Sequence, residues 1–189
     1  VDIDRATGET KVRRFYALDD CGTRINPMII EGQIHGGLTE GFAVAMGQQM
    51  PFDAQGNLLG NTLMDYFLPT FVETPHWETD HTVTPSPHHP LGAKGVAESP
   101  HVGSIPTFTS AIVDAFSHQG MTHMDMPHSA FRVWKELKSR GLNLYPPAAL
   151  RATPQGAALA ARQSRFRGAL GWRVFTRSVS RSGRRVADP

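Results

Sequence analysis

The first residues whose types could do chemistry lie between Gly92 and Glu98, where the chain reads GAKGVAE. Small residues let a backbone approach a ligand closely and point several N–H groups at one anion. A helix is expected to follow, and its N-terminus would favour a bound negative group. Lys94 is not followed by Ser or Thr, so this is not a nucleotide P-loop. The pattern is compatible with a ligand loop and with an ordinary glycine-rich turn.

A second candidate is the stretch from Glu31 to Gly37, which reads EGQIHGG and falls in a predicted helix. The amide of Gln33 offers a donor and an acceptor, so it can lie against a flat polar ligand. Each glycine in a helix costs up to about 1 kcal/mol relative to alanine, so a group of them indicates that something packs very close to the backbone. That neighbour can be a ligand or a second helix. The glycines are Gly32, Gly36, Gly37, Gly41 and Gly47.

The nine histidines form no metal-binding pattern, because they are scattered and the one adjacent pair, His88 and His89, is poorly placed to share an ion. We therefore expect no side chain of this protein to ligate a metal. Cys21 is the only cysteine, so it can form no internal disulfide and cannot hold an iron–sulfur cluster alone. It is interpreted as a small turn residue, as are the preceding Asp19 and Asp20.

The elements that would position these stretches predict an α+β fold with a short mixed sheet and two main packing helices. A hairpin is expected over residues 1–19, because Thr7-Gly8 separates two runs with strand character. Asn26-Pro27 predicts a helix start, since Asn can cap free N–H groups and Pro suits the first turn. That helix should run to about Gln49, and a second from about Gly103 to Phe116. Further strands are expected over 57–66, 77–83 and 121–126, and a short helix over 127–138.

The formal net charge of +2 conceals two regions of opposite charge. Residues 1–140 contain ten Lys or Arg and sixteen Asp or Glu, whereas residues 141–189 contain nine Arg and a single acid, Asp188. We expect residues 1–140 to fold and residues 141–189 to be a weakly structured tail rich in Arg, Ala and Ser. No run of 18 apolar residues and no N-terminal signal pattern is present, so a cytoplasmic protein is expected.

Six motifs occur together in one order along residues 1–138. In that order and spacing they resemble the molybdopterin-binding large subunit of the xanthine dehydrogenase, aerobic carbon monoxide dehydrogenase and aldehyde oxidase family. Each motif is weak alone, and six in order make the assignment specific. After the Thr7-Gly8 turn they are Asp20-Cys21-Gly22, Asn26-Pro27, GQIHGG at 32–37, Asp65-Tyr66 with Pro69, GAKGVAE at 92–98, and Met126-Pro127 with Val133-Trp134.

The resemblance implies a C-terminal molybdopterin-binding region of a molybdenum hydroxylase, over residues 1–140. Such proteins oxidise the carbon of an aldehyde, an N-heterocycle or carbon monoxide with oxygen taken from water. Glu98 matches the family's general base, and Gln33 matches a glutamine that hydrogen-bonds at the cofactor. The cofactor would be molybdopterin with molybdenum, in its cytosine dinucleotide form. Further expected cofactor contacts are Gly32, Gly36, Gly37, Ala93, Lys94, Gly95, Val96 and Ala97.

The resemblance also implies partners, because this family builds its site from two halves of a long subunit. The expected partners are the remainder of the large subunit and an iron–sulfur and a flavin subunit carrying [2Fe-2S] and FAD. Ala97 departs from the family, which commonly has Gly there, and its methyl group could narrow the approach to the cofactor. Two alternatives stay open: an inactive truncated remnant, and a basic tail that binds nucleic acid or an acidic surface.

Overall fold

The structure is a computed structural model that describes residues 1–143, so most of the predicted tail lies outside the described residues. The predicted α+β class is confirmed, with the strands forming two separate pairs instead of one mixed sheet. Within residues 1–143 no helix combines the length and apolar character needed to cross a membrane. In chain order the elements are β1 (Asp2–Ile3), β2 (Thr10–Lys11), β3 (Phe15–Asp20), α1 (Pro27–Met46), β4 (Trp77–Thr82), α2 (Ser99–Asp114), the 3₁₀ helix η1 (Ser117–Gln119) and α3 (Ala130–Ser139).

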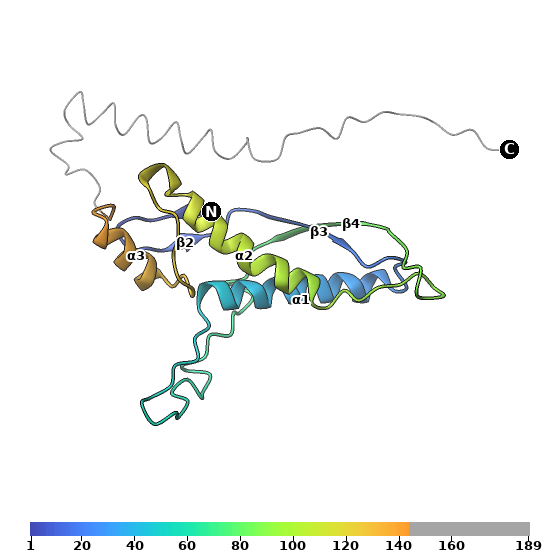
Figure 1. The fold of residues 1–189 in the computed structure, drawn as a ribbon, viewed down its shortest axis with the longest axis horizontal. Coiled ribbons are helices and arrows are strands. Elements are labelled where there is room, and N and C mark those ends of the chain that lie inside the picture. Colours follow the sequence, from blue (N-terminus) through green and yellow to red (C-terminus); the bar gives the residue numbers. More distant parts are fainter. Residues whose placement is uncertain (144–189) are drawn as a thin grey trace. The chain divides into compact units, whose positions relative to one another are not determined.

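The two long helices pack against each other beside a two-stranded parallel ribbon of β3 and β4 (Figure 1). The register runs from Phe15 opposite Trp77 to Asp20 opposite Thr82. The predicted hairpin is confirmed for β1 and β2, which are antiparallel. Its expected return strand is divided, however, because β2 ends at Lys11 and β3 pairs with a distant strand whose Trp77 contacts Phe15 in the core.

The start of α1 is the predicted one. The side chain of Asn26 accepts a hydrogen bond from the backbone N–H of Ile29 at 3.3 Å, and Pro27 occupies the first turn. The helix ends at Met46, three residues before the predicted end. The second helix, α2, begins at Ser99, four residues earlier than expected, because Pro100 also suits a first helical turn.

Two apolar clusters hold the elements together. In the first, the ring of Phe108 from α2 lies 4.9 Å from Phe15 and 5.6 Å from Phe42, measured between centroids. Trp77 and buried residues of α1 complete this cluster. The second packs α3 against the end of α2 and includes the buried Met121 and Met124. Residues 121–126 form no strand, however, so the strand predicted there is wrong.

The segment from 48 to 76, here called the arm, projects away from the helices as the teal loop in Figure 1. The strand predicted over residues 57–66 is wrong, since the arm has only a bridge between Phe52 and Leu58 and local turns. Asp53 accepts hydrogen bonds from the backbone N–H groups of Gln55 and Asn57 and closes one of these turns. Hydrogen bonds within a few residues thus replace the ladder that a strand would need.

Candidate cofactor-binding site

The glycine-rich loop of residues 92–98 is built against the turn that follows β3. The backbone N–H of Lys94 donates to the carbonyl of Cys21 at 2.7 Å, and that of Thr23 donates to the carbonyl of Gly92 at 3.0 Å. Gly22 and Gly92 both have positive φ, at 66° and 68°. A Cβ on Gly22 would lie 2.1 Å from the oxygen of Gly92, so only glycine allows this contact.

The side chain of Lys94 is directed to this same turn. Its ammonium lies 2.8 Å from the carboxylate of Asp20. The hydrogen bond from Lys94, followed by those from Thr84 and Gly22, holds the pKa of Asp20 far below its usual range. The backbone N–H and the ammonium of Lys94 are therefore both bound within the chain, and Ala93 beside it forms a β-bridge with Gly22.

The next three residues of the loop offer free donors. Among the described residues, no acceptor is bonded to the backbone N–H groups of Gly95, Val96 and Ala97. Gly95 has open space beside it, whereas the side chain of Val96 packs on the first apolar cluster. Together with the first turn of α2, these N–H groups form a concentration of donors suited to an acceptor-rich ligand.

Glu98 stands between this loop and α2. It precedes the first residue of the helix, yet its side chain makes no capping hydrogen bond. The carboxylate is exposed and has no hydrogen bond or ion pair to residues 1–143. A carboxylate in this position is available to a ligand held by the loop.

The glycines of α1 divide into two stripes with different surroundings. A Cβ on Gly37 would lie 2.7 Å from the ring of Pro100, and one on Gly41 would lie 1.8 Å from the hydroxyl of Ser104. These two glycines allow α2 to cross α1 closely, so a second helix is their neighbour. Gly32 and Gly36 have nothing within 4 Å, so a ligand could reach the helix backbone there.

Gln33 connects these features. It is exposed and lies one turn before Gly37 on the same face of α1. The space beside Gly37 is bounded by the carbonyl oxygen of Ala97, 3.3 Å from where its Cβ would be. The structure thus brings the two predicted stretches, 31–37 and 92–98, to one region.

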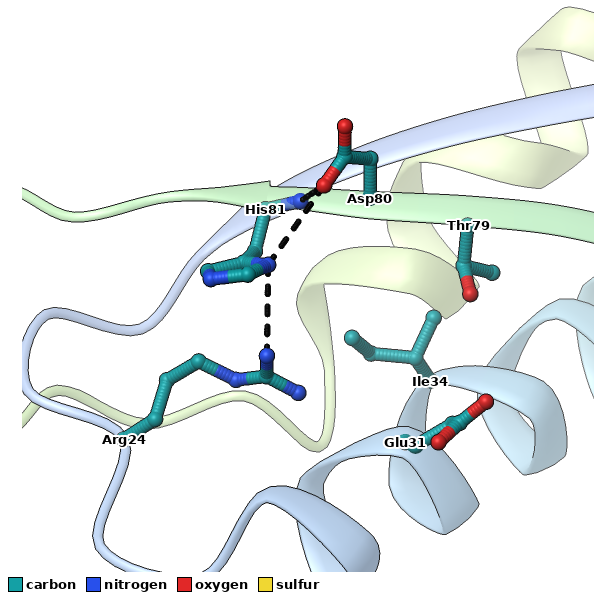
Figure 2. A pocket seen from close by; sticks show the side chains of 6 residues that line it. All are labelled: Arg24, Glu31, Ile34, Thr79, Asp80 and His81. Atoms are coloured by element: carbon teal, nitrogen blue, oxygen red, sulfur yellow. Dashed lines mark hydrogen bonds and ion pairs between the residues drawn. The ribbon is translucent and has the colours of Figure 1, made fainter. Parts of the chain in front are cut away.

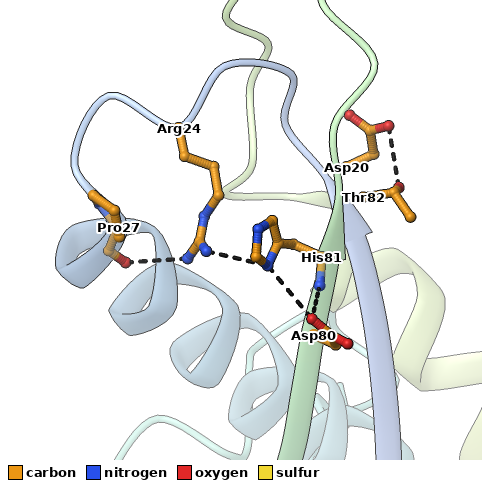
Figure 3. A network of polar contacts seen from close by, with 6 residues as sticks. All are labelled: Asp20, Arg24, Pro27, Asp80, His81 and Thr82. Carbon is orange, nitrogen blue, oxygen red and sulfur yellow. Dashed lines mark hydrogen bonds and ion pairs between the residues drawn. The ribbon is translucent and has the colours of Figure 1, made fainter. Parts of the chain in front are cut away.

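A shallow pocket of about 140 Å³ lies between the first turns of α1 and β4 (Figure 2). None of the predicted site residues lines it. Within it, Arg24 donates to Nδ1 of His81 at 3.2 Å and to the carbonyl of Pro27 at 3.4 Å, which joins the strand ribbon to α1 (Figure 3). The described residues contain no group of three or more His, Cys, Asp or Glu that could hold a metal ion.

The loop and the open glycine stripe suit a flat group with several acceptors. Three unbonded N–H groups and the start of α2 can bind its oxygens and nitrogens. The amide of Gln33 can pair with a ring edge, and the uncovered backbone at Gly32 and Gly36 leaves room for it. A pterin with a phosphate has this combination of acceptors, so the residues present fit that group.

Comparison with known proteins decides the family. The molybdopterin cofactor-binding domain family matches residues 1–75. Over 144 residues the chain is 88% identical to the carbon monoxide dehydrogenase large chain of Hydrogenophaga pseudoflava, covering 76% of this chain and 18% of that protein. The chain belongs to the molybdopterin-binding family of carbon monoxide and xanthine dehydrogenases. The predicted resemblance is therefore confirmed.

Solved structures of this family agree. Carbon monoxide dehydrogenase from Oligotropha carboxidovorans superimposes with a TM-score of 0.72 at 66% identity, over 75% of this chain and 18% of that one. Quinoline 2-oxidoreductase from Pseudomonas putida 86 gives 0.69 at 37% identity, over 73% and 18%. The chain thus spans about a fifth of the length of the family members it matches.

Two residues of the site were missed when Asp19 and Asp20 were interpreted only as turn residues. Asp20 does close a turn, because its carboxylate accepts from the N–H of Gly22 at 2.9 Å. The same carboxylate binds Lys94, and that of Asp19 accepts from the hydroxyl of Ser99 at 2.6 Å. These partners are more than 70 residues away in the sequence, so no local pattern could indicate them.

Proposed function

We propose that this chain supplies part of the molybdopterin site of a molybdenum-dependent dehydrogenase that oxidises carbon monoxide. Carbon monoxide is supported as the substrate by the 88% identity to a carbon monoxide dehydrogenase large chain. The heterocycle-oxidising relative, quinoline 2-oxidoreductase, is only 37% identical over a similar span. Carbon monoxide is therefore favoured over an aldehyde or an N-heterocycle.

The cofactor would be a molybdopterin in its cytosine dinucleotide form, held by donors of the loop. The N–H groups of Gly95, Val96 and Ala97 would bind its acceptor atoms, and the amide of Gln33 would contact it from α1. When bound, this cofactor supplies a Lewis-acidic metal that accepts two electrons from the substrate. The open backbone at Gly32 and Gly36 would let it approach the helix.

Glu98 would act as the general base. Its carboxylate is exposed beside the loop and is engaged by no other described residue, so it can accept a proton from the water that provides the product's oxygen. The anchoring of the loop on both sides would hold this carboxylate in one place. Enclosure of Glu98 would come from the remainder of the large subunit.

The remaining partners follow from the two electrons that must leave the site. An iron–sulfur and a flavin subunit, with [2Fe-2S] and FAD, would carry them away. The remainder of the large subunit would complete the pterin contacts and the substrate pocket. The short span of this chain relative to its relatives supports a need for that remainder.

The test is carbon monoxide-dependent dye reduction by the assembled complex, with Glu98→Gln as the main variant. Glutamine keeps the size of the side chain but accepts no proton, so turnover should fall by about 100-fold or more while the molybdenum content stays constant. Glu9→Gln, at an exposed turn of the β1–β2 hairpin, serves as the control. Undiminished turnover in Glu98→Gln would refute the assignment of this base.

The alternative of an inactive remnant makes a different prediction in the same preparation. A complex that assembles normally and contains no molybdenum would support the remnant and contradict our proposal. The alternative of a nucleic-acid-binding tail concerns residues 141–189, and nearly all of them lie outside the described residues.

A further inference from the structure

Two consecutive carboxylates at the end of β3 hold both ends of the loop that carries Glu98. Asp20 binds the ammonium of Lys94 at 2.8 Å, near the start of the loop. Asp19 accepts from the hydroxyl of Ser99 at 2.6 Å, where the loop meets α2. Between these anchors lie the three free N–H groups and Glu98.

Asp20 is the point at which three segments meet. Besides Lys94 and the N–H of Gly22, its carboxylate accepts from the N–H of Thr84 at 3.1 Å and from the hydroxyl of Thr82 at 3.2 Å. Figure 3 shows Asp20 and Thr82 side by side at the ends of β3 and β4. Two backbone bonds, Lys94 to Cys21 and Thr23 to Gly92, reinforce the same junction. The start of the loop is therefore fixed by charge and by main-chain pairing together.

Asp19 acts on the other end. The hydroxyl of Ser99 donates to Asp19 and also lies 3.4 Å from the carbonyl of Val96, so it closes the last turn of the loop. Ser99 immediately follows Glu98. Because consecutive strand side chains leave opposite faces, the two aspartates can reach different parts of one loop.

We infer that Asp19 and Asp20 are positioning residues that hold the loop from Lys94 to Ser99 in its binding geometry before any cofactor arrives. Donors that are already oriented need no rearrangement when the ligand binds, and a base held in place reacts more readily. The expected effect of these aspartates on cofactor binding and turnover rests on the proposed function. The effect on the loop itself does not.

The loop can be tested directly by amide hydrogen exchange in the full chain within its complex. Asp20→Asn keeps an oxygen acceptor but removes the charge that binds Lys94. The N–H groups of Lys94 and Thr23 should then exchange about tenfold faster, while those of the core of α1 are unchanged. Asp20→Glu, which restores the charge, should recover part of the protection.

The matched control for this experiment is Asp53→Asn in the arm. Asp53 also accepts several local hydrogen bonds, from Gln55 and Asn57, and lies in a separate turn. The Asp53→Asn substitution should leave the amide hydrogen exchange of the loop unaltered. Unchanged exchange at Lys94 and Thr23 in Asp20→Asn would overturn the inference, and so would equal acceleration throughout α1 without recovery in Asp20→Glu.

A second experiment addresses Asp19 in the loaded complex through molybdenum content, kcat and KM for carbon monoxide. Asp19→Ala removes the acceptor of the Ser99 hydroxyl, so kcat should fall about tenfold with molybdenum and KM maintained. Asp19→Asn retains an acceptor and should recover much of the rate. Equal losses in both variants, or a wild-type rate in Asp19→Ala, would contradict the role of Asp19. Wild-type complex without molybdenum would instead contradict the proposed function, and the exchange experiment would still decide the positioning role.

Discussion

The pair of Lys94 and Asp20 is a charge interaction at a partly exposed site, and its main consequence is a pH dependence. Lys94, Thr84 and Gly22 all stabilise the ionised form of Asp20 and lower its pKa. An aspartate whose pKa is lower in the folded state stabilises the fold above its unfolded value, near 4, and this contribution is lost as the pH falls towards the folded pKa.

Lys94→Met should therefore weaken the acid dependence of stability. The variant loses the largest cause of the shift, so its melting temperature should lie below that of the wild-type chain at pH 6. The difference in melting temperature between the two proteins should shrink as the pH falls below about 4. There the unfolded wild-type chain takes up a proton on Asp20, so the wild-type chain loses the stabilisation that the variant lacks. Thermal unfolding of the purified chain between pH 3 and 7 measures this, and a constant difference at every pH would contradict it.

His128 provides a second titratable group, and here burial is the cause. The side chain is buried, its Nε2 lies 3.0 Å from the hydroxyl of Thr109, and its backbone N–H donates to Ala45 at 2.7 Å. Burial, with repulsion from Arg132, lowers the pKa of the imidazole. His128 is thus held neutral at a junction of α1, α2 and the start of α3.

A histidine whose pKa is lowered by folding destabilises the protein at acid pH, because the unfolded chain takes up the proton more readily. Stability should be constant with respect to this group above about pH 7 and should fall as the pH drops through its unfolded value, near 6.5. His128→Gln should have a flatter dependence between pH 7 and 5 despite a lower melting temperature at pH 7. Parallel curves for the two proteins would show that another group causes the acid loss.

At the scale of elements, the crossing of α1 and α2 depends on glycines that touch the second helix. The predicted group of glycines correctly indicated a close neighbour, but it could not separate Gly37 and Gly41, which face α2, from Gly32 and Gly36, which face open space. That distinction requires the helix rotation and the crossing angle, and both are set by distant apolar contacts such as Phe42 with Phe108.

Alanine substitutions should separate the two stripes. Gly41→Ala places a Cβ 1.8 Å from the hydroxyl oxygen of Ser104, so the free energy of unfolding should fall by about 1–3 kcal/mol. Gly36→Ala meets no atom and should raise it by up to about 1 kcal/mol through helix propensity. Denaturant unfolding measures both. If Gly36→Ala also lowers the molybdenum content of the complex, the open stripe is a cofactor contact, whereas a loss of stability in Gly36→Ala would mean that the stripe is covered.

The prediction of a helix succeeded where a capping signal and a helical period coincide. The prediction of a strand failed where the segment has no neighbouring strand to pair with. Asn26-Pro27 located the start of α1, and the strand expected over residues 77–83 matches β4. Residues 121–126 alternate like a strand, but Met121 and Met124 reach the core from a segment without a ladder. Residues 57–66 lie in the arm, where local hydrogen bonds to Thr62 satisfy the backbone N–H groups of Met64, Asp65 and Tyr66. Strand pairing depends on neighbours that a local pattern does not contain.

At the scale of the whole molecule, motif order identified the family although no single motif could. Motif residues far apart in the chain, such as Asp20 and Lys94, meet around one loop, which explains why their types and order are informative together. Cofactor contact by Gln33 and the role of Glu98 as general base stay predictions.

The arm is the clearest sign of a missing neighbour within the described residues. Phe71, Met64 and Val72 are 96%, 93% and 91% exposed, and five more large apolar side chains of the arm are also exposed. Folded proteins rarely leave such a concentration of apolar surface in water, because burying it is favourable by roughly 25 cal/mol per Å². Since the chain spans about a fifth of its relatives, the expected cover is the remainder of the large subunit.

This predicts that the arm is accessible in the chain alone and protected in the complex. Limited proteolysis should cleave the isolated chain between residues 48 and 76 at least about tenfold faster than the assembled complex, since cleavage needs an exposed, locally open backbone. Phe71→Ser should weaken assembly because it removes apolar area from the expected contact, whereas Gln55→Ser, at a polar turn of the same arm, should not. Cleavage at equal rates in the chain and the complex would mean that the arm stays uncovered after assembly. That outcome would contradict burial of the arm by the remainder of the large subunit.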